Sequence, residues 1–99
     1  MTETLKNTQM IIDLIPFGHE NAVSRERLCY RSGLSDREVR RAIGELNECG
    51  NVILNRGEGY FRYDAETDRY YLEHYLAVEK GRIRTLNRKL RKMRKAAGL

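Results

Sequence analysis

The chain has 99 residues, which suits one small domain with one appended element. With 40% hydrophobic and 33% charged residues it has a soluble globular composition. No apolar run approaches the ~18 residues of a membrane span, and the N-terminal segment lacks the layout of a signal peptide. Cys29 and Cys49 show no metal-ligand spacing. We therefore expect a cytoplasmic protein with reduced cysteines, without metal, cofactor or membrane partner.

The net charge of +5 is unevenly distributed along the chain. Residues 1–23 carry one basic and three acidic side chains, residues 24–50 six and five, and residues 51–68 two and four. Residues 69–99 carry ten and two. Such asymmetry is typical of a chain with an anionic partner.

Three helices are predicted in the first half of the chain. The first runs from about Leu5 to Ile15, because Pro16 disfavours helical conformation in the residue before it. Residues 16–22 are predicted to form a loop, and Phe17 and Val23 are expected to pack on the core. The second helix starts after Ser24, a typical N-cap, and ends near residue 31.

The third helix has the strongest local pattern. It follows the turn SGLS (32–35) and opens with SDRE (35–38), a capping box in which Ser35 caps and Glu38 reaches back. Val39, Ala42, Ile43 and Leu46 then recur at i, i+3, i+4 and i+7, which predicts an amphipathic helix ending near Gly50.

A hairpin and a long helix complete the predicted elements. Residues 51–55 (NVILN) and 60–63 (YFRY) read as short strands joined by the glycine turn RGEG. A helix is then predicted from about Ala65 to Lys95, weakened only by Gly81 at ~1 kcal/mol. The expected fold is mainly α with a small β-hairpin, in two parts: residues 1–64, and a long basic helix over residues 65–99.

The order helix, helix-turn-helix, hairpin is that of a winged helix-turn-helix domain. The matching features are Leu28 and Cys29, the SGLS turn, the apolar stripe of the third helix and the GEGY segment (57–60). Residues 5–63 thereby resemble winged-helix DNA-binding domains such as that of the biotin operon repressor, and small winged-helix proteins of phages and prophages. The resemblance implies binding to double-stranded DNA.

The solvent face of the third helix is also suited to DNA. With the apolar stripe inward, the helical period places Arg37, Arg40, Arg41, Gly44 and Asn47 outward. Arginine pairs well with guanine edges and phosphates, and a recognition helix reaches bases with its N-terminal residues. The candidate DNA contacts are Ser35, Asp36, Arg37, Arg40, Arg41, Gly44, Arg56 and Arg62. A solvated mixed-charge face, with arginines paired to neighbouring acids, is the alternative interpretation.

The last helix carries a heptad seam and a basic run. The seam is broken only at Glu79 and comprises Leu72, Leu76, Ile83, Leu86, Leu90, Met93 and Ala97. Ile83, Leu86, Leu90 and Met93 are the candidate dimer seam. Phosphate or acidic-partner contacts are expected from Arg84, Arg88, Arg91, Lys92 and Lys95. A parallel homodimer would place Lys89 against Arg94 of its partner, so a homodimer, an acidic partner helix and a segment ordered only by a polyanion remain open.

No catalytic arrangement is evident. His19 and His74 lack ligand spacing, and no phosphate-binding glycine loop occurs. We expect a sequence-specific DNA-binding protein without enzymatic activity or a small-molecule substrate. Its role would be transcription regulation in a bacterium or phage, or phage replication or recombination. An adaptor that binds an acidic protein and an RNA-binding protein are the alternatives.

Overall fold

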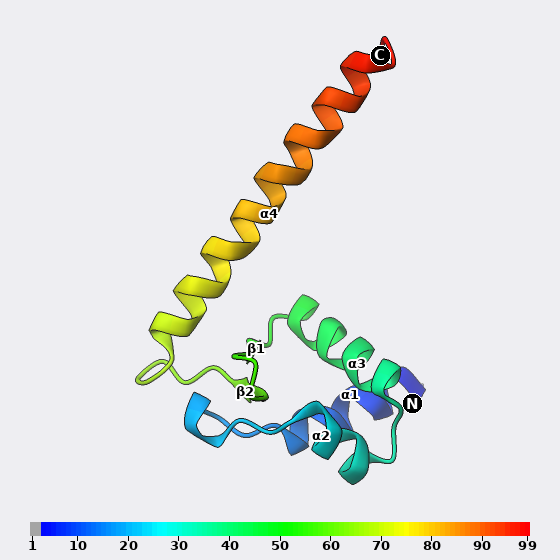
Figure 1. Cartoon of the computed structure of the whole chain (residues 1–99). Coiled ribbons are helices and arrows are strands. Elements are labelled where there is room, and N and C mark those ends of the chain that lie inside the picture. Colours follow the sequence, from blue (N-terminus) through cyan, green and yellow to red (C-terminus); the bar gives the residue numbers. More distant parts are fainter. Residues whose placement is uncertain (1–2) are drawn as a thin grey trace. The chain divides into compact units, whose positions relative to one another are not determined.

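The computed structural model describes residues 3–99. In chain order it contains α1 (Glu3–Leu14), the 3₁₀ helix η1 (His19–Asn21), α2 (Arg25–Ser32), α3 (Asp36–Glu48), β1 (Ile53–Asn55), β2 (Tyr60–Arg62) and α4 (Arg69–Ala96) (Figure 1). This confirms the mainly α fold with a small hairpin and a long C-terminal helix. The chain divides into an N-terminal unit that ends at Arg69 and a C-terminal unit from Tyr70 to Leu99.

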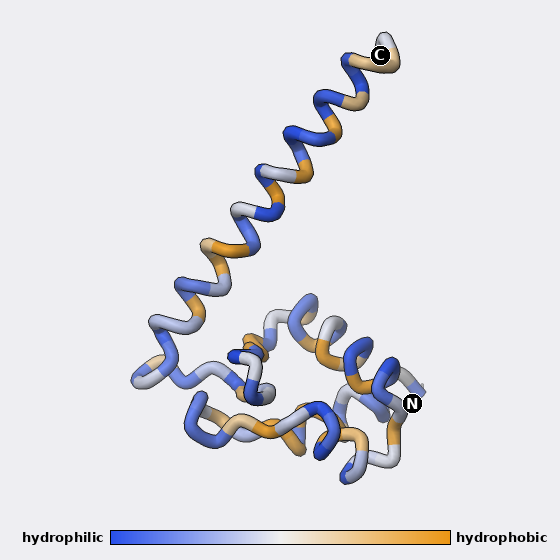
Figure 2. Tube along the Cα trace, in the orientation of Figure 1, coloured by the Kyte–Doolittle hydropathy of each residue, from blue (hydrophilic) through white to orange (hydrophobic). Residues whose placement is uncertain are grey.

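The core of the N-terminal unit lies between α1, α2, α3 and the hairpin. Its buried cluster is formed by Ile11, Ile15, Leu28, Val39, Ala42, Ile43, Leu46 and Ile53. All four apolar residues predicted for the third helix belong to it, and Figure 2 shows the hydrophobic parts of the helices gathered between them. The helical period of the sequence therefore predicted correctly which face of α3 is buried.

The predicted starts of α2 and α3 are confirmed by their caps. Ser24 Oγ accepts a hydrogen bond from Arg27 N at 3.1 Å. In the capping box, Glu38 N donates to Ser35 Oγ at 3.2 Å, and Ser35 N donates to Glu38 Oε1 at 3.1 Å. Between these helices Gly33 adopts φ +75°, and its N–H donates to Cys29 O at 2.9 Å. The chain thus passes from α2 into α3 through a glycine in the left-handed region.

The segment between α1 and α2 is more ordered than the predicted loop. It contains η1 and lies along the hairpin, where Val23 and Tyr60 exchange two backbone hydrogen bonds of 2.9 and 2.7 Å. Gly59 permits this approach, because a Cβ at its position would collide with Val23 O. β1 and β2 pair antiparallel, with Leu54 opposite Phe61.

The prediction that Phe17 packs on the core is wrong. Its side chain is 56% exposed, and the Arg62 guanidinium lies over its ring at 4.1 Å from the centroid. Val23, in contrast, packs against the core as expected. Phe61, which precedes Arg62 on β2, is fully buried.

The last helix begins at Arg69, four residues later than predicted. Asp68, which is fully buried, accounts for the difference. Its carboxylate accepts hydrogen bonds from Asp64 N at 2.9 Å, His19 N at 3.1 Å and Thr67 Oγ1 at 3.0 Å, and His19 Nδ1 lies 2.7 Å away. These bonds hold residues 64–68 in a turn against η1, so helix formation starts only after Asp68.

Candidate nucleic-acid interface

The exposed face of α3 holds the arginines predicted to contact DNA. Arg37, Arg40, Arg41 and Gly44 are all exposed, opposite the buried stripe of the helix. Within the described part of the chain, Arg37 has no hydrogen-bond or ion-pair partner. Its guanidinium and five donors are therefore available to an external ligand.

Asp36 positions two arginines at the start of α3. One carboxylate oxygen forms an ion pair with Arg25 Nε, and the other lies 2.9 Å from Arg40 Nη2. Hydrogen bonds with Tyr60 and then with Asp36 raise the pKa of Arg25. Because Tyr60 belongs to β2, this chain of contacts runs from the hairpin through α2 to α3. Asp36 was predicted as a DNA contact, and in the structure it is engaged with these two cations.

Arg25 is a candidate site residue that the sequence prediction missed. It is the first residue of α2, directly after the cap Ser24, just as Asp36 directly follows the cap Ser35. Only the packing of α2 on α3 brings the two helix N-termini together. The ion pair between Arg25 and Asp36 joins the first residues of the two helices, and helix N-termini attract phosphate.

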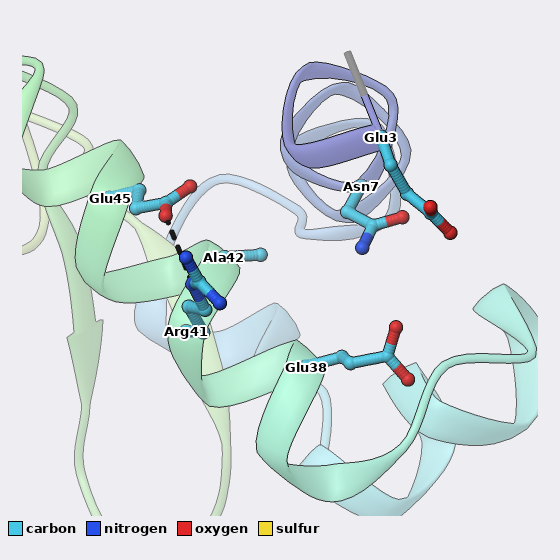
Figure 3. Close-up of a pocket in the computed structure, with 6 residues that line it drawn as sticks. All are labelled: Glu3, Asn7, Glu38, Arg41, Ala42 and Glu45. Carbon is cyan, nitrogen blue, oxygen red and sulfur yellow. Dashed lines mark hydrogen bonds and ion pairs between the residues drawn. The ribbon is translucent and has the colours of Figure 1, made fainter.

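The opposite side of α3 is acidic. An open pocket of about 360 Å³ lies between α1 and α3, lined by Glu3, Asn7, Glu38, Arg41, Ala42 and Glu45 (Figure 3). Arg41 Nε lies 3.3 Å from Glu45 Oε1, as the dashed line in Figure 3 marks. Hydrogen bonds with Ser35 lower the pKa of Glu38, which favours its charged form. Three carboxylates around this pocket make it unfavourable for phosphate.

The three predicted arginines of α3 are thus separated by the packing. Arg40 is linked through Asp36 to the side of α2 and the hairpin, whereas Arg41 is paired on the side of α1. Arg37 lies between them on the outward face. The helix consequently has a basic side and an acidic side, a polarity that its sequence of mixed charges does not reveal.

Gly44 lies one to two turns after Arg37 and Arg40 on the same exposed face. A Cβ at this position would meet no heavy atom within 4 Å. Packing within the described residues therefore does not require a glycine here. A glycine inside a helix lowers helix stability by ~1 kcal/mol relative to alanine, and the structure offers no compensating contact.

The two hairpin arginines differ in their surroundings. Arg56 is exposed in the turn between β1 and β2, next to Gly57 with φ +92°. Arg62 is half-buried, and its Nε donates to Ile15 O at 2.7 Å while the guanidinium covers Phe17. Arg62 therefore binds a carbonyl group just beyond the end of α1, and Arg56 is the more accessible of the two to an external partner.

Asn47 has a structural role that its predicted place on the solvent face did not suggest. Ile53 N donates to Asn47 Oδ1 at 2.8 Å, and Asn47 Nδ2 donates to Ile53 O at 3.2 Å. These paired bonds hold β1 against the end of α3. They set the position of the hairpin relative to the exposed arginines.

The C-terminal helix carries its seam and its basic run on different faces. No residue of α4 is buried, and Ile83, Leu86, Leu90 and Met93 are 46–58% exposed. Figure 2 shows hydrophobic and hydrophilic positions alternating along the helix. With Ile83 at heptad position a, all five predicted phosphate contacts fall at b, c or f: Arg84, Arg88, Arg91, Lys92 and Lys95. Helix pairing through the seam would leave these cations accessible.

Comparisons of the chain with protein-family models, with curated proteins and with solved structures found no match. Among residues 3–99, none of the helices combines the length and apolar character needed to cross a membrane. No group of three or more His, Cys, Asp or Glu side chains in that part of the chain is placed to hold a metal ion. The cysteines of this part are unpaired, with Cys29 partly buried and Cys49 exposed, and Cys29 packs against the core.

Proposed function

We propose that the chain is a sequence-specific double-stranded DNA-binding protein. In this proposal the N-terminal unit is a winged helix-turn-helix domain, similar to that of the biotin operon repressor. Helices α2 and α3 form the helix-turn-helix, α3 enters the major groove, and β1 and β2 form the wing. The order of the elements and the capped turn between α2 and α3 support the assignment.

The observation that carries the proposal is the outward face of α3. Arg37 has no partner among the described residues, and Gly44 has open space where a side chain would stand. A glycine that lowers helix stability and serves no internal contact is expected where another backbone approaches closely. The first two turns of the helix, which hold Arg37 and Arg40, are those that reach base edges in helix-turn-helix proteins.

The charge of the N-terminal unit explains how such binding would be oriented. Residues 1–68 carry nine basic and twelve acidic side chains. The unit is therefore net negative, and phosphate would approach only on the side away from the pocket of Glu3, Glu38 and Glu45. Much of the overall attraction to DNA would come from α4, which carries ten basic and two acidic residues.

For α4 we propose two compatible roles: contact with phosphate through its outer cations, and association with a second copy through its seam. The biological role that fits best is regulation of transcription in a bacterium or phage, with phage replication or recombination as the nearest variant.

The proposal can be tested by fluorescence anisotropy with the full chain and DNA duplexes selected from a random pool. Arg37→Ala should weaken binding to the selected sequence by ~1–3 kcal/mol if the side chain reads a base. Arg41→Ala is the matched control, because it removes one cation from the same helix on the acidic side. We expect a smaller loss for this variant.

Three results would contradict the DNA proposal in different ways. Equal losses of DNA affinity for Arg37→Ala and Arg41→Ala would contradict the assignment of the outward face of α3 as the DNA contact. Failure of the full chain to bind any duplex at low salt would favour an adaptor for an acidic protein. Equal affinity for structured RNA would favour recognition of phosphate without a preference for B-form DNA.

A further inference from the structure

The charges along α4 are segregated by position. Its two acidic residues, Glu73 and Glu79, lie in the first eleven residues, whereas residues 80–95 carry nine cations and no acid. The apolar seam of α4 is exposed along most of the helix: the exposed fraction is 46% for Leu76, 58% for Ile83 and 57% for Met93. Most helical stability in proteins comes from packing of such an apolar face, so the seam calls for a partner helix.

A parallel, in-register pair of α4 helices would oppose like charges. Each heptad layer would then face its own copy, so Glu79 at position d would meet Glu79 of the second copy. In the flanks, Lys89 at g would face Arg94 at e of the second copy. The two basic halves would lie side by side, and both helix dipoles would point in one direction.

An antiparallel pair removes the largest of these conflicts. When Ile83 faces Leu86 of the second copy, Leu76 faces Met93 and Leu72 faces Ala97. Glu79 then faces Leu90 in the basic half of the second copy, not another Glu79. Glu73 and Arg94, both at position e, come together across the pair twice, because e positions meet e positions in this orientation.

The antiparallel pair retains one kind of repulsive contact, which also occurs twice across the pair. Arg82 and Lys89, both at position g, face each other across the pair. Arg82 Nη1, however, lies 2.8 Å from Glu79 Oε1 of its own helix. This carboxylate partly neutralises Arg82 and so reduces its repulsion with Lys89 of the second copy. The balance of charges and the opposed helix dipoles therefore favour the antiparallel orientation.

We propose that α4 associates with α4 of a second copy as an antiparallel pair centred near Arg84 and Thr85. This inference rests on the self-association proposed above and does not depend on DNA binding. The N-terminal units would attach at opposite ends of the pair. The starts of the two helices at Arg69, about 31 residues apart along the pair, would be separated by ~45 Å at a rise of ~1.5 Å per residue.

Sedimentation equilibrium of the full chain, without DNA, tests the proposal. The wild-type protein should form dimers, and more strongly at ~0.5 M than at ~0.1 M salt, because salt screens the repulsion between two helices that each carry ten basic and two acidic residues. Arg94→Glu replaces the attraction to Glu73 of the second copy by repulsion. Its control, Arg88→Glu, makes the same charge change at outward position f.

The antiparallel pair predicts a dimer dissociation constant about fivefold higher for Arg94→Glu than for Arg88→Glu, since two exposed pairs are reversed. The double variant Glu73→Arg/Arg94→Glu should restore the affinity, and circular dichroism verifies that each variant keeps its helix content. A parallel pair predicts the opposite, because Arg94→Glu would then attract Lys89 and tighten the dimer. That result, a monomeric wild-type protein at both salt concentrations, or a higher oligomer would overturn the proposal.

Discussion

At the scale of single residues, we expect folding and the proposed DNA binding to favour different residues at position 44. Its position would accommodate a Cβ without contact. Gly44→Ala should therefore stabilise the protein by up to ~1 kcal/mol, which raises the melting temperature by ~4–8 °C for a domain of this size. If DNA approaches this face closely, the same change should weaken DNA binding. Thermal denaturation and anisotropy on the same samples give both values.

A gain in stability without any change in DNA affinity would mean that no partner backbone approaches Gly44. Gly33→Ala is the control for the stability measurement. A Cβ added at Gly33 would also meet no heavy atom within 4 Å, but the φ of +75° at this residue disfavours a side chain. We expect this variant to be destabilised, which would show that backbone conformation and not vacant space decides the outcome there.

Asp68 is the residue from which we expect a pH dependence of stability. Burial alone would raise the pKa of its carboxyl group, but the hydrogen bonds from His19, Asp64 and Thr67 outweigh burial and hold the pKa below its usual value. The unfolded state then binds more protons than the folded state in the acid range. The contribution of Asp68 is therefore complete above about pH 5 and is lost as the pH falls through the folded-state pKa.

Chemical denaturation of wild-type protein and Asp68→Asn between about pH 3 and 7 tests this expectation. The variant should lose ~1.5–3 kcal/mol at neutral pH, as expected for hydrogen bonds to a charged group, and should show a flatter acid limb. Glu66→Gln, which changes an exposed carboxyl group nearby, should keep the wild-type pH profile. Parallel profiles for wild type and Asp68→Asn would contradict the assignment.

At the scale of elements, the coupling of α3 to the hairpin depends on Asn47. Asn47→Ala would leave the backbone N–H and carbonyl groups of Ile53 without their side-chain partners, and Ile53 is buried. We expect a loss of ~1–3 kcal/mol in the free energy of unfolding. Glu48→Ala, the exposed neighbour on the same helix, should change it by less than ~0.5 kcal/mol. Equal effects in urea denaturation would show that the two bonds contribute little.

The elements also differ in how far local sequence determines them. The capping box and the period of its apolar residues predicted α3 and its buried face. The two glycines of the turn predicted the hairpin, which is confirmed with short strands of three residues each. The start of α4 was predicted too early, because residues 65–68 have no strong local helix breaker and are held in a turn by the distant His19.

At the scale of the whole molecule, the basic charge is concentrated in α4, while residues 1–68 have an acidic excess. Replacing Arg88, Arg91, Lys92 and Lys95 by glutamine changes only positions outside the seam. If these side chains neutralise phosphate, the magnitude of the log–log salt slope of DNA binding should fall by ~0.9 for each phosphate that is no longer neutralised. The preferred DNA sequence should stay the same, because phosphate contacts carry no base information.

Anisotropy titrations at several salt concentrations, with selected and random duplexes, measure both quantities. An unchanged slope would mean that α4 does not contact DNA. A changed sequence preference would mean that α4 takes part in base recognition. Sedimentation of the same variant should still show self-association, which would separate the outer cations from the apolar seam.

The sequence by itself determined the features that depend on neighbours within about one helical turn or one hairpin. These are the caps at Ser24 and Ser35, the buried stripe of α3, the glycine turn and the separation of the basic run of α4 from its seam. Each arises from helix periodicity, strand pairing or side-chain bonds to the nearest backbone groups, and these act over a few residues.

Only the tertiary structure decided which charged groups of the N-terminal unit remain available. Arg62 reaches Ile15 and Asp68 reaches His19 across 47 and 49 residues of sequence. Asp36 binds Arg25 because α2 and α3 pack with their starts together. The sequence does not show whether an arginine binds a carbonyl group, a carboxylate or no partner. The packing of the core determines which groups lie within its reach. In this packing Arg37 has no partner among the described residues, and a Cβ at Gly44 would meet no heavy atom within 4 Å.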